Sequence, residues 1–223
     1  MSPVNDALQI GISGDGGAAI KIFLLMTALS FGPALVMSVT SFLRIIVVLS
    51  FLRQALGSPQ LPPNPVLLGL ALFLTIFIMR PTLERVHDEA LAPYLDDKIG
   101  YQAALDHGGG ALKAFMLPQT REDDLALFYD LSSAPRPERV EDIPVSIAVP
   151  AFMLSELTTG FRMGLFLFIP LLLVDLLIAA ILMSFGMMMV PPQMVALPLK
   201  IAVFLLADGW HLVVASLARS FHG

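Results

Sequence analysis

The chain has no cysteine among its 223 residues, which excludes disulfides, thiolate metal sites and a cysteine nucleophile. Basic residues are also few, 13 against 18 acidic ones, and none precedes Lys21. No lysine- and arginine-rich stripe with interleaved aromatics occurs, so we expect no nucleic-acid partner. Residues 1–17 are polar and acidic and lack the basic start of a secretory signal peptide, so either there is none or this numbering begins after it.

Apolar residues, in contrast, are abundant. They make up 57% of the chain, charged residues make up only 14%, and the mean hydropathy is +0.81. A soluble domain of this length rarely needs so much apolar material. The composition therefore predicts an all-α, polytopic membrane protein, built from kinked helical hairpins with a small soluble helical insert.

Charge divides the chain into four segments. Between Arg80 and Val149 there are thirteen acidic and seven basic residues. We predict a polar N-terminal segment (1–17), a first helical hairpin (18–79), an acidic helical insert (80–149) and a second helical hairpin with a methionine-rich turn (150–223). Four spans would place the loop after Arg53 and the methionine turn on the cytoplasmic side and the insert on the opposite side of the membrane.

Glycine and proline suggest interruptions within these segments. Gly32-Pro33 should break the first apolar stretch, and the run from Gly57 to Pro65 reads as a loop because its prolines cannot donate helical hydrogen bonds. Pro170 and Pro198 should kink the helices of the second hairpin. The glycine triplet 108–110 has no phosphate-loop lysine or serine, so we interpret it as a flexible joint.

The most informative segment is the turn of the second hairpin, where Met187, Met188 and Met189 run into Pro191 and Pro192. Methionine is a common flexible filler of apolar contacts, and this triplet can be no more than that. At a turn, however, unbranched thioethers from several copies could form a deformable ring. We favour this second interpretation, a pore gate.

Two opposite charges flank the turn at similar distances. Gly164 to Phe185 contains one charge, Asp175, and Val195 to Ala207 contains one charge, Lys200. An unpaired charge at a bilayer centre costs about 2.5 to 3.5 kcal/mol on insertion scales, so we predict that the two form a buried ion pair. A pair that fixes helix register is favoured over a proton relay or gating pair.

Four further charges lie in apolar surroundings and are predicted to be buried: Arg44, Glu156, Arg162 and Asp208. Arg44 and Glu156 could form a second pair. The histidines lack ligand spacing such as HExxH, and no phosphate loop or catalytic constellation occurs. We therefore expect no metal, no cofactor, no catalytic residues and no enzyme activity.

Five blocks of sequence carry a resemblance to one family: Thr40 to Ile46, Gly69 to Thr75, Pro150 to Leu157, Met187 to Pro192 and Asp208 to Trp210. From about Ile20 to its end the chain resembles the FliP family of flagellar export-gate proteins, whose relatives serve virulence type III secretion. The resemblance implies a pore-forming core subunit that conducts unfolded flagellar proteins across the bacterial inner membrane in the flagellar basal body.

The same resemblance implies the partners: several copies, five in a ring, with FliR-like and FliQ-like subunits and further export-apparatus membrane proteins, and unfolded export substrates. It also implies that most apolar helices pack against each other above the membrane. A rival hypothesis is an ion-coupled transporter with Asp175, Lys200 and Asp208 as its relay. Transporters usually show internal repeats, and none is convincing here.

Overall fold

The computed structural model describes residues 16–58, 61–132, 135, 137, 139, 142–187 and 189–221. The described residues form helices and no strand, which confirms the predicted all-α class. They divide into two compact units, residues 1–37 and 38–223. In the first unit, α2 (Gly16–Val39) is the helix described.

The expected break at Gly32-Pro33 is wrong. Helix α2 continues through Pro33 to Val39, and the interruption falls at Thr40-Ser41. There the hydroxyl of Thr40 accepts a hydrogen bond from the backbone N–H of Phe42 at 3.3 Å. A hydroxyl that competes for a backbone donor favours a helix boundary, whereas one proline removes a single helical bond.

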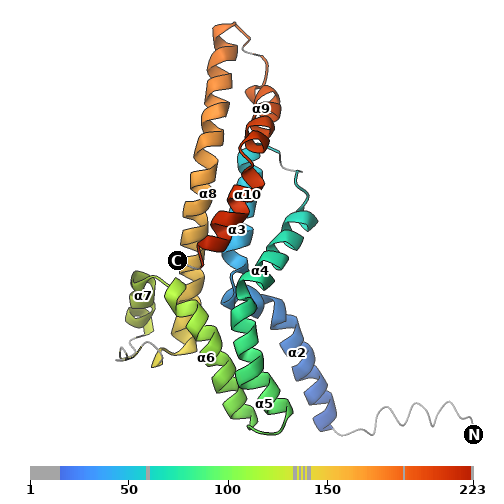
Figure 1. The fold of residues 1–223 in the computed structure, drawn as a ribbon, viewed down its shortest axis with the longest axis vertical. Helices are drawn as coiled ribbons and strands as arrows, with labels where there is room; N and C mark the ends of the chain where they lie inside the picture. The colour runs from blue at the N-terminus through green and yellow to red at the C-terminus, as the bar shows by residue number, and fades with distance from the viewer. Residues whose placement is uncertain are drawn as a thin grey trace, which may run out of the picture. The chain divides into compact units, whose positions relative to one another are not determined.

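Where the second unit is described, it is made of nine further helical elements. Figure 1 shows how they are arranged. They are α3 (Phe42–Leu56), α4 (Asn64–Val86), the π-helical turn η1 (His87–Leu91), α5 (Ala92–Leu95), α6 (Tyr101–Gln119), α7 (Glu122–Ser132), α8 (Val145–Ser184), α9 (Pro192–Leu206) and α10 (Gly209–Arg219). Pro170 and Pro198 lie inside α8 and α9 without ending either helix.

Helix α3 is the centre of the core and packs most extensively against α8. Ile45 and Leu49 of α3 are completely buried. The two helices approach closely at Gly160 and Gly164 of α8: a β-carbon at Gly164 would lie 2.6 Å from the ring of Phe51, closer than atoms can pack. Glycine at this position therefore lets α3 and α8 touch along their length.

The acidic insert continues directly from the first hairpin, and no helix boundary separates them at Arg80. Helix α4 runs through Arg80 into η1 and α5, and α6 then folds back against η1. The glycine triplet 108–110 lies inside α6, so the expected flexible joint is wrong. A β-carbon at Gly108 would lie 3.5 Å from that of Ala90, an ordinary packing distance, so α6 lies close against η1 at this position.

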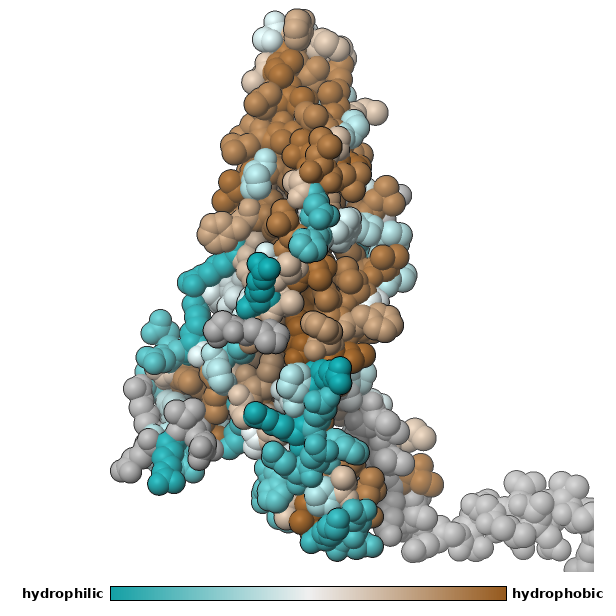
Figure 2. Space-filling view, in the orientation of Figure 1, coloured by the Kyte–Doolittle hydropathy of each residue, from teal (hydrophilic) through white to brown (hydrophobic). Residues whose placement is uncertain are grey.

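Two of the described helical stretches, Asn64–Leu95 and Val145–Ser184, are long and apolar enough to cross a membrane, and up to four spans result if each of two bent helix pairs is counted as one. Figure 2 shows hydrophobic residues over the end of the second unit that carries the α8–α9 turn and hydrophilic residues over the end formed by α5, α6 and α7. The second unit is thus amphipathic along its length.

Candidate functional site

The α8–α9 turn is a defined structure. Helix α8 ends in a Schellman motif, in which the N–H of Met187 donates to the carbonyl of Leu182 at 3.0 Å and the N–H of Gly186 donates to that of Met183 at 3.0 Å. Gly186 has φ +74°, a left-handed conformation that glycine adopts without steric cost. The next helix begins at Pro192, and Pro191 is extended. The backbone thus fixes where the methionines leave α8.

Met187 and Met189 of this turn are exposed in the single chain. Met189 is 96% exposed and Met187 is 46% exposed. Met188 lies outside the described residues. Phe185 and Met183, also exposed, extend the apolar surface down α8. A soluble monomer would rarely present so concentrated an apolar tip, so the tip is suited to contact with lipid or with other protein.

The structure brings Asp175 and Lys200 together across the hairpin, with 2.5 Å between Lys200 Nζ and a carboxylate oxygen of Asp175. Lys200 also donates to the carbonyl of Ala55, at 2.9 Å, near the end of α3. A cation is favoured there because helix C-termini carry partial negative charge. The lysine side chain is 4% exposed and the aspartate 30%. The pair therefore joins three helices rather than two.

The contact with Ala55 fixes how far the hairpin projects. The α3–α4 loop, which begins at Gly57, lies beside Lys200, and only about 12 Å of α9 separates Lys200 from the start of that helix. Irregular backbone does not face lipid hydrocarbon, whose core is about 30 Å thick. The hairpin beyond this loop is too short to cross that thickness. This face must therefore be covered by protein or lie outside the hydrocarbon.

Arg44 is the second charged centre, and its guanidinium group donates hydrogen bonds to several partners. Its guanidinium forms a two-pronged contact with the carboxylate of Glu156: Nε donates to one oxygen at 2.9 Å and a terminal nitrogen donates to the other. It also donates to the carbonyl and the hydroxyl of Ser220, at 2.9 and 3.0 Å, and to the amide oxygen of Gln119 at 3.2 Å. All three guanidinium nitrogens are engaged.

This cluster, the Arg44 hub, unites α3, α6, α8 and the residues after α10. The Arg44 guanidinium carbon lies 3.8 Å from the centre of the Phe221 ring, which also stacks on Phe115 of α6 at 6.1 Å. Gln119 closes the cluster by donating to the carbonyl of Phe221 at 3.2 Å. Both members of the ion pair are buried. The hub therefore joins these elements of the second unit.

Arg162 and Asp208 are not buried, which corrects the expectation from the sequence. Arg162 is two residues from both Gly160 and Gly164, so on a helix it points away from the face that meets α3, and it is exposed. Asp208 occupies the corner between α9 and α10 with φ +50°, and its side chain is 80% exposed. Apolar neighbours in sequence do not bury a charge when helix phase or a corner turns it outward.

A third polar cluster, which the sequence analysis missed, docks the insert on α8. Asp124 of α7 is buried and accepts two hydrogen bonds from Arg121, each at 2.8 Å. Ser155 of α8 donates to the same carboxylate at 2.5 Å and accepts from the backbone N–H of Arg121 at 3.0 Å. The run 121–124, one arginine followed by three acids, was the available signal. It does not indicate which acid turns inward.

The docking of α7 should weaken at acid pH. Hydrogen bonds from Arg121, and secondarily from Ser155, hold the pKa of Asp124 below its usual value. A carboxyl group whose pKa is lowered by folding stabilises the fold fully above its unfolded pKa, about 3.9, and loses that contribution as pH falls through the lower folded pKa. The protection factors of the α7 amides, which correct for the pH dependence of intrinsic exchange, should therefore fall below about pH 4.

The matched variant for this prediction is Asp124→Asn, which keeps the shape of the side chain and removes its titration. The protection factors of its α7 amides should be lower than those of the wild type at pH 7 and should show little further change between pH 5 and 3. An acid response of the same size in both proteins would contradict the assignment to Asp124.

Within the described residues no group of three or more metal-ligating side chains occurs. The buried charges at Arg44, Glu156, Lys200 and Asp124 are used to join helices. The fold and its sites define an all-α membrane protein with charged pairs between its helices and an exposed, methionine-bearing tip.

Comparison with known proteins identifies which such protein this is. The FliP family model matches residues 25–217. The chain is 50% identical to the flagellar biosynthetic protein FliP of Pectobacterium carotovorum subsp. carotovorum, over 92% of this chain and 79% of that protein. It is 46% identical to the protein of the same name from Bacillus subtilis (strain 168), over 98% of this chain and 100% of that protein. The chain belongs to the FliP family and is a membrane protein of the flagellar apparatus that serves flagellar assembly.

Proposed function

We propose that this chain is a pore-forming core subunit of the flagellar type III protein export gate, which conducts unfolded flagellar proteins across the bacterial inner membrane. Several copies, five in a ring, surround the conduit together with FliR-like and FliQ-like subunits and further membrane proteins of the export apparatus. The insert is periplasmic, and the energy for transport is supplied elsewhere in the machine. The observation that carries the proposal is the exposed methionine tip of the α8–α9 hairpin.

Assembly into a ring is consistent with the surface of the single chain. Phe166, Phe185 and Leu206 are each more than three-quarters exposed along the hairpin. The α3–α4 loop beside Lys200 argues against a hairpin that is simply surrounded by lipid. Neighbouring copies and small partner subunits would cover the exposed residues of the hairpin.

Lys200 also bears on the transporter alternative. A relay lysine exchanges protons with water or substrate, whereas Lys200 is buried and engaged by both Asp175 and the carbonyl of Ala55. This arrangement favours a structural role for the pair. Asp208, the third member of the suggested relay, lies two helical turns away from Lys200 along α9.

In this proposal the turn closes the conduit at rest. A channel wide enough for an unfolded polypeptide leaks ions unless something deformable seals it, and a narrow apolar ring does so by excluding water. Methionine has several soft torsions and no β-branch, so it can fill such a ring and yield to a passing chain. The Schellman motif at Gly186 and the prolines after Val190 keep the methionines from being drawn into a helix.

Replacement of Met187, Met188 and Met189 with alanine should raise the passive ion permeability of cells that express the variant with its partner subunits. The measurement is an ion-leak or growth-sensitivity assay, with assembly monitored in parallel. Met183→Ala is the matched control, because Met183 is an exposed methionine about one turn below the tip. It should leave permeability unchanged. An intact triple-alanine ring with normal permeability would place the seal on another subunit.

A further inference from the structure

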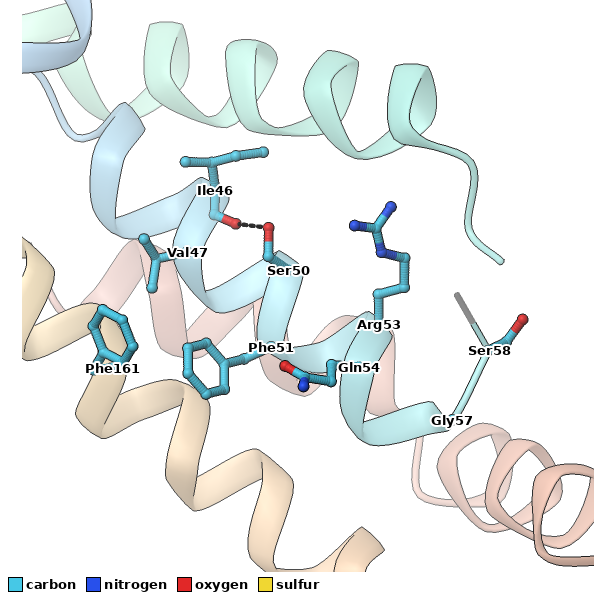
Figure 3. A pocket seen from close by; sticks show the side chains of 9 residues that line it. All are labelled: Ile46, Val47, Ser50, Phe51, Arg53, Gln54, Gly57, Ser58 and Phe161. Atoms are coloured by element: carbon cyan, nitrogen blue, oxygen red, sulfur yellow. Dashed lines mark hydrogen bonds between the residues drawn. The ribbon is translucent and has the colours of Figure 1, made fainter. Parts of the chain in front are cut away.

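A groove runs along the outer side of α3. It has a volume of about 640 Å³. Figure 3 shows Phe161, which α8 contributes, beside Phe51 of α3, while Arg53 extends away from them. The two aromatic rings are 5.1 Å apart in an edge-to-face arrangement. The groove is lined by Ile46, Val47, Ser50, Phe51, Arg53, Gln54, Gly57, Ser58 and Phe161.

The lining is divided by polarity along its length. The half nearest the start of α3 is formed by Ile46, Val47 and the two phenylalanine rings, while Arg53, Gln54 and Ser58 gather at the other half. A ligand that matches this lining is itself amphiphilic, with an apolar tail and a polar head. We infer that the groove binds an anionic phospholipid, with one acyl chain along Val47 and Phe51 and the phosphate at Arg53.

The lining favours an acyl chain over an extended polypeptide. From Ile46 to Gly57 the groove follows α3 for about 17 Å. An extended polypeptide would fit, but its backbone N–H and C=O groups would lie unpaired against the apolar half. An acyl chain has no such groups.

The charge at the polar end favours an anionic head group. Among the described residues, which exclude 59 and 60 of the adjoining loop, Arg53 has one recorded partner, the neutral amide oxygen of Asn64. Its positive charge is therefore not balanced by an acid there, and an arginine has five N–H donors, of which most remain for a phosphate. The hydroxyl of Ser58 accepts from the N–H of Leu61 at 3.2 Å and can still donate.

The end of α3 lies at this half of the groove, and its carbonyl groups would repel a phosphate. Lys200 donates to one of them, that of Ala55, and its nitrogen lies 3.6 Å from where a β-carbon on Gly57 would be. Asp175 balances the charge of Lys200, so the lysine reduces this repulsion only by engaging the carbonyl. Arg53 therefore supplies the positive charge of the site.

The test is native mass spectrometry of the full-length chain in mild detergent, with phosphatidylglycerol or phosphatidylcholine added at equal concentration. The wild type should retain phosphatidylglycerol in preference. Arg53→Gln, which keeps a donor for Asn64 but removes the charge, should retain about tenfold less. Arg53→Lys should keep most of the binding. The matched control is Arg85→Gln, an exposed arginine of α4 outside the groove, and it should behave as the wild type.

Equal retention of the two lipids, or unchanged phosphatidylglycerol on Arg53→Gln, would overturn the inference. If Arg53→Gln does not fold, the test is the Tm of the wild type measured with each of the two lipids. A lipid that binds the folded state raises Tm, so phosphatidylglycerol should raise it more than phosphatidylcholine. The same Tm with either lipid counts against the site. A photo-crosslinking amino acid at Ser50 that captures only protein, from a second copy or a partner subunit, would also overturn it.

Discussion

Replacement of Arg44 with alanine should abolish accumulation of the folded protein and, with it, motility. The change leaves Glu156 charged and completely buried without a partner, and breaking a buried pair in this way costs about 3–5 kcal/mol. It also removes the donors to Ser220 and Gln119. Typical domains are stable by only about 5–15 kcal/mol. The loss should be visible in protein abundance in membranes and in thermal unfolding of what can be purified.

The variants around Arg44 distinguish a hub from a simple pair. Removal of both charges, as in Arg44→Met with Glu156→Leu, often restores stability when two residues bond only to each other. Here it should not, because the carbonyl of Ser220 and the amide of Gln119 lose their donor in the double variant as well. Arg44→Lys should recover part of the stability. A double apolar variant as stable as the wild type would reduce the cluster to an isolated ion pair.

Asp175→Ala should destabilise the protein more than Lys200→Ala does. The first leaves a cation that is only 4% exposed beside a single carbonyl, whereas the second leaves a carboxylate that is 30% exposed and can be hydrated. We expect about 3 kcal/mol for Asp175→Ala and less for Lys200→Ala. A double-mutant cycle on purified protein, followed by thermal unfolding, measures both values and their coupling.

Exchange of the two charges provides the control for this prediction. If the pair were all that mattered, Asp175→Lys with Lys200→Asp would restore much of the loss. The structure predicts a poor recovery, because an aspartate at 200 would face the carbonyl of Ala55, an acceptor facing an acceptor. Full recovery would show that the contact with α3 contributes nothing to stability.

The sequence predicted these charge centres in part. Asp175 and Lys200 stood out because each is the single charge of its apolar segment. Their similar distances from the turn indicated that they could meet. The other partners in the Arg44 hub could not be found in this way. Gln119 and Ser220 are 75 and 176 residues from Arg44, are common residue types, and act through an amide and a backbone carbonyl. No local pattern encodes such contacts.

The wrong expectations have related physical causes. Arg162 and Asp208 were judged by their neighbours in the sequence, but exposure depends on helix phase in one case and on the α9–α10 corner in the other. The glycines at 108–110 were interpreted as a flexible joint because they lack the lysine or serine of a phosphate loop. They lie inside α6, which packs against η1, and such tertiary packing overrides the low helix propensity of glycine.

The position of Ser220 and Phe221 also determines when the protein can finish folding. Arg44 is synthesised well before Ser220, whose carbonyl and hydroxyl accept from one of its terminal nitrogens, and before Phe221, whose ring covers its flat face. Until these two residues have been added, the guanidinium lacks those partners, so α3, α6 and α8 cannot reach their final packing around it. The second unit therefore closes only after residues 220 and 221 have been synthesised.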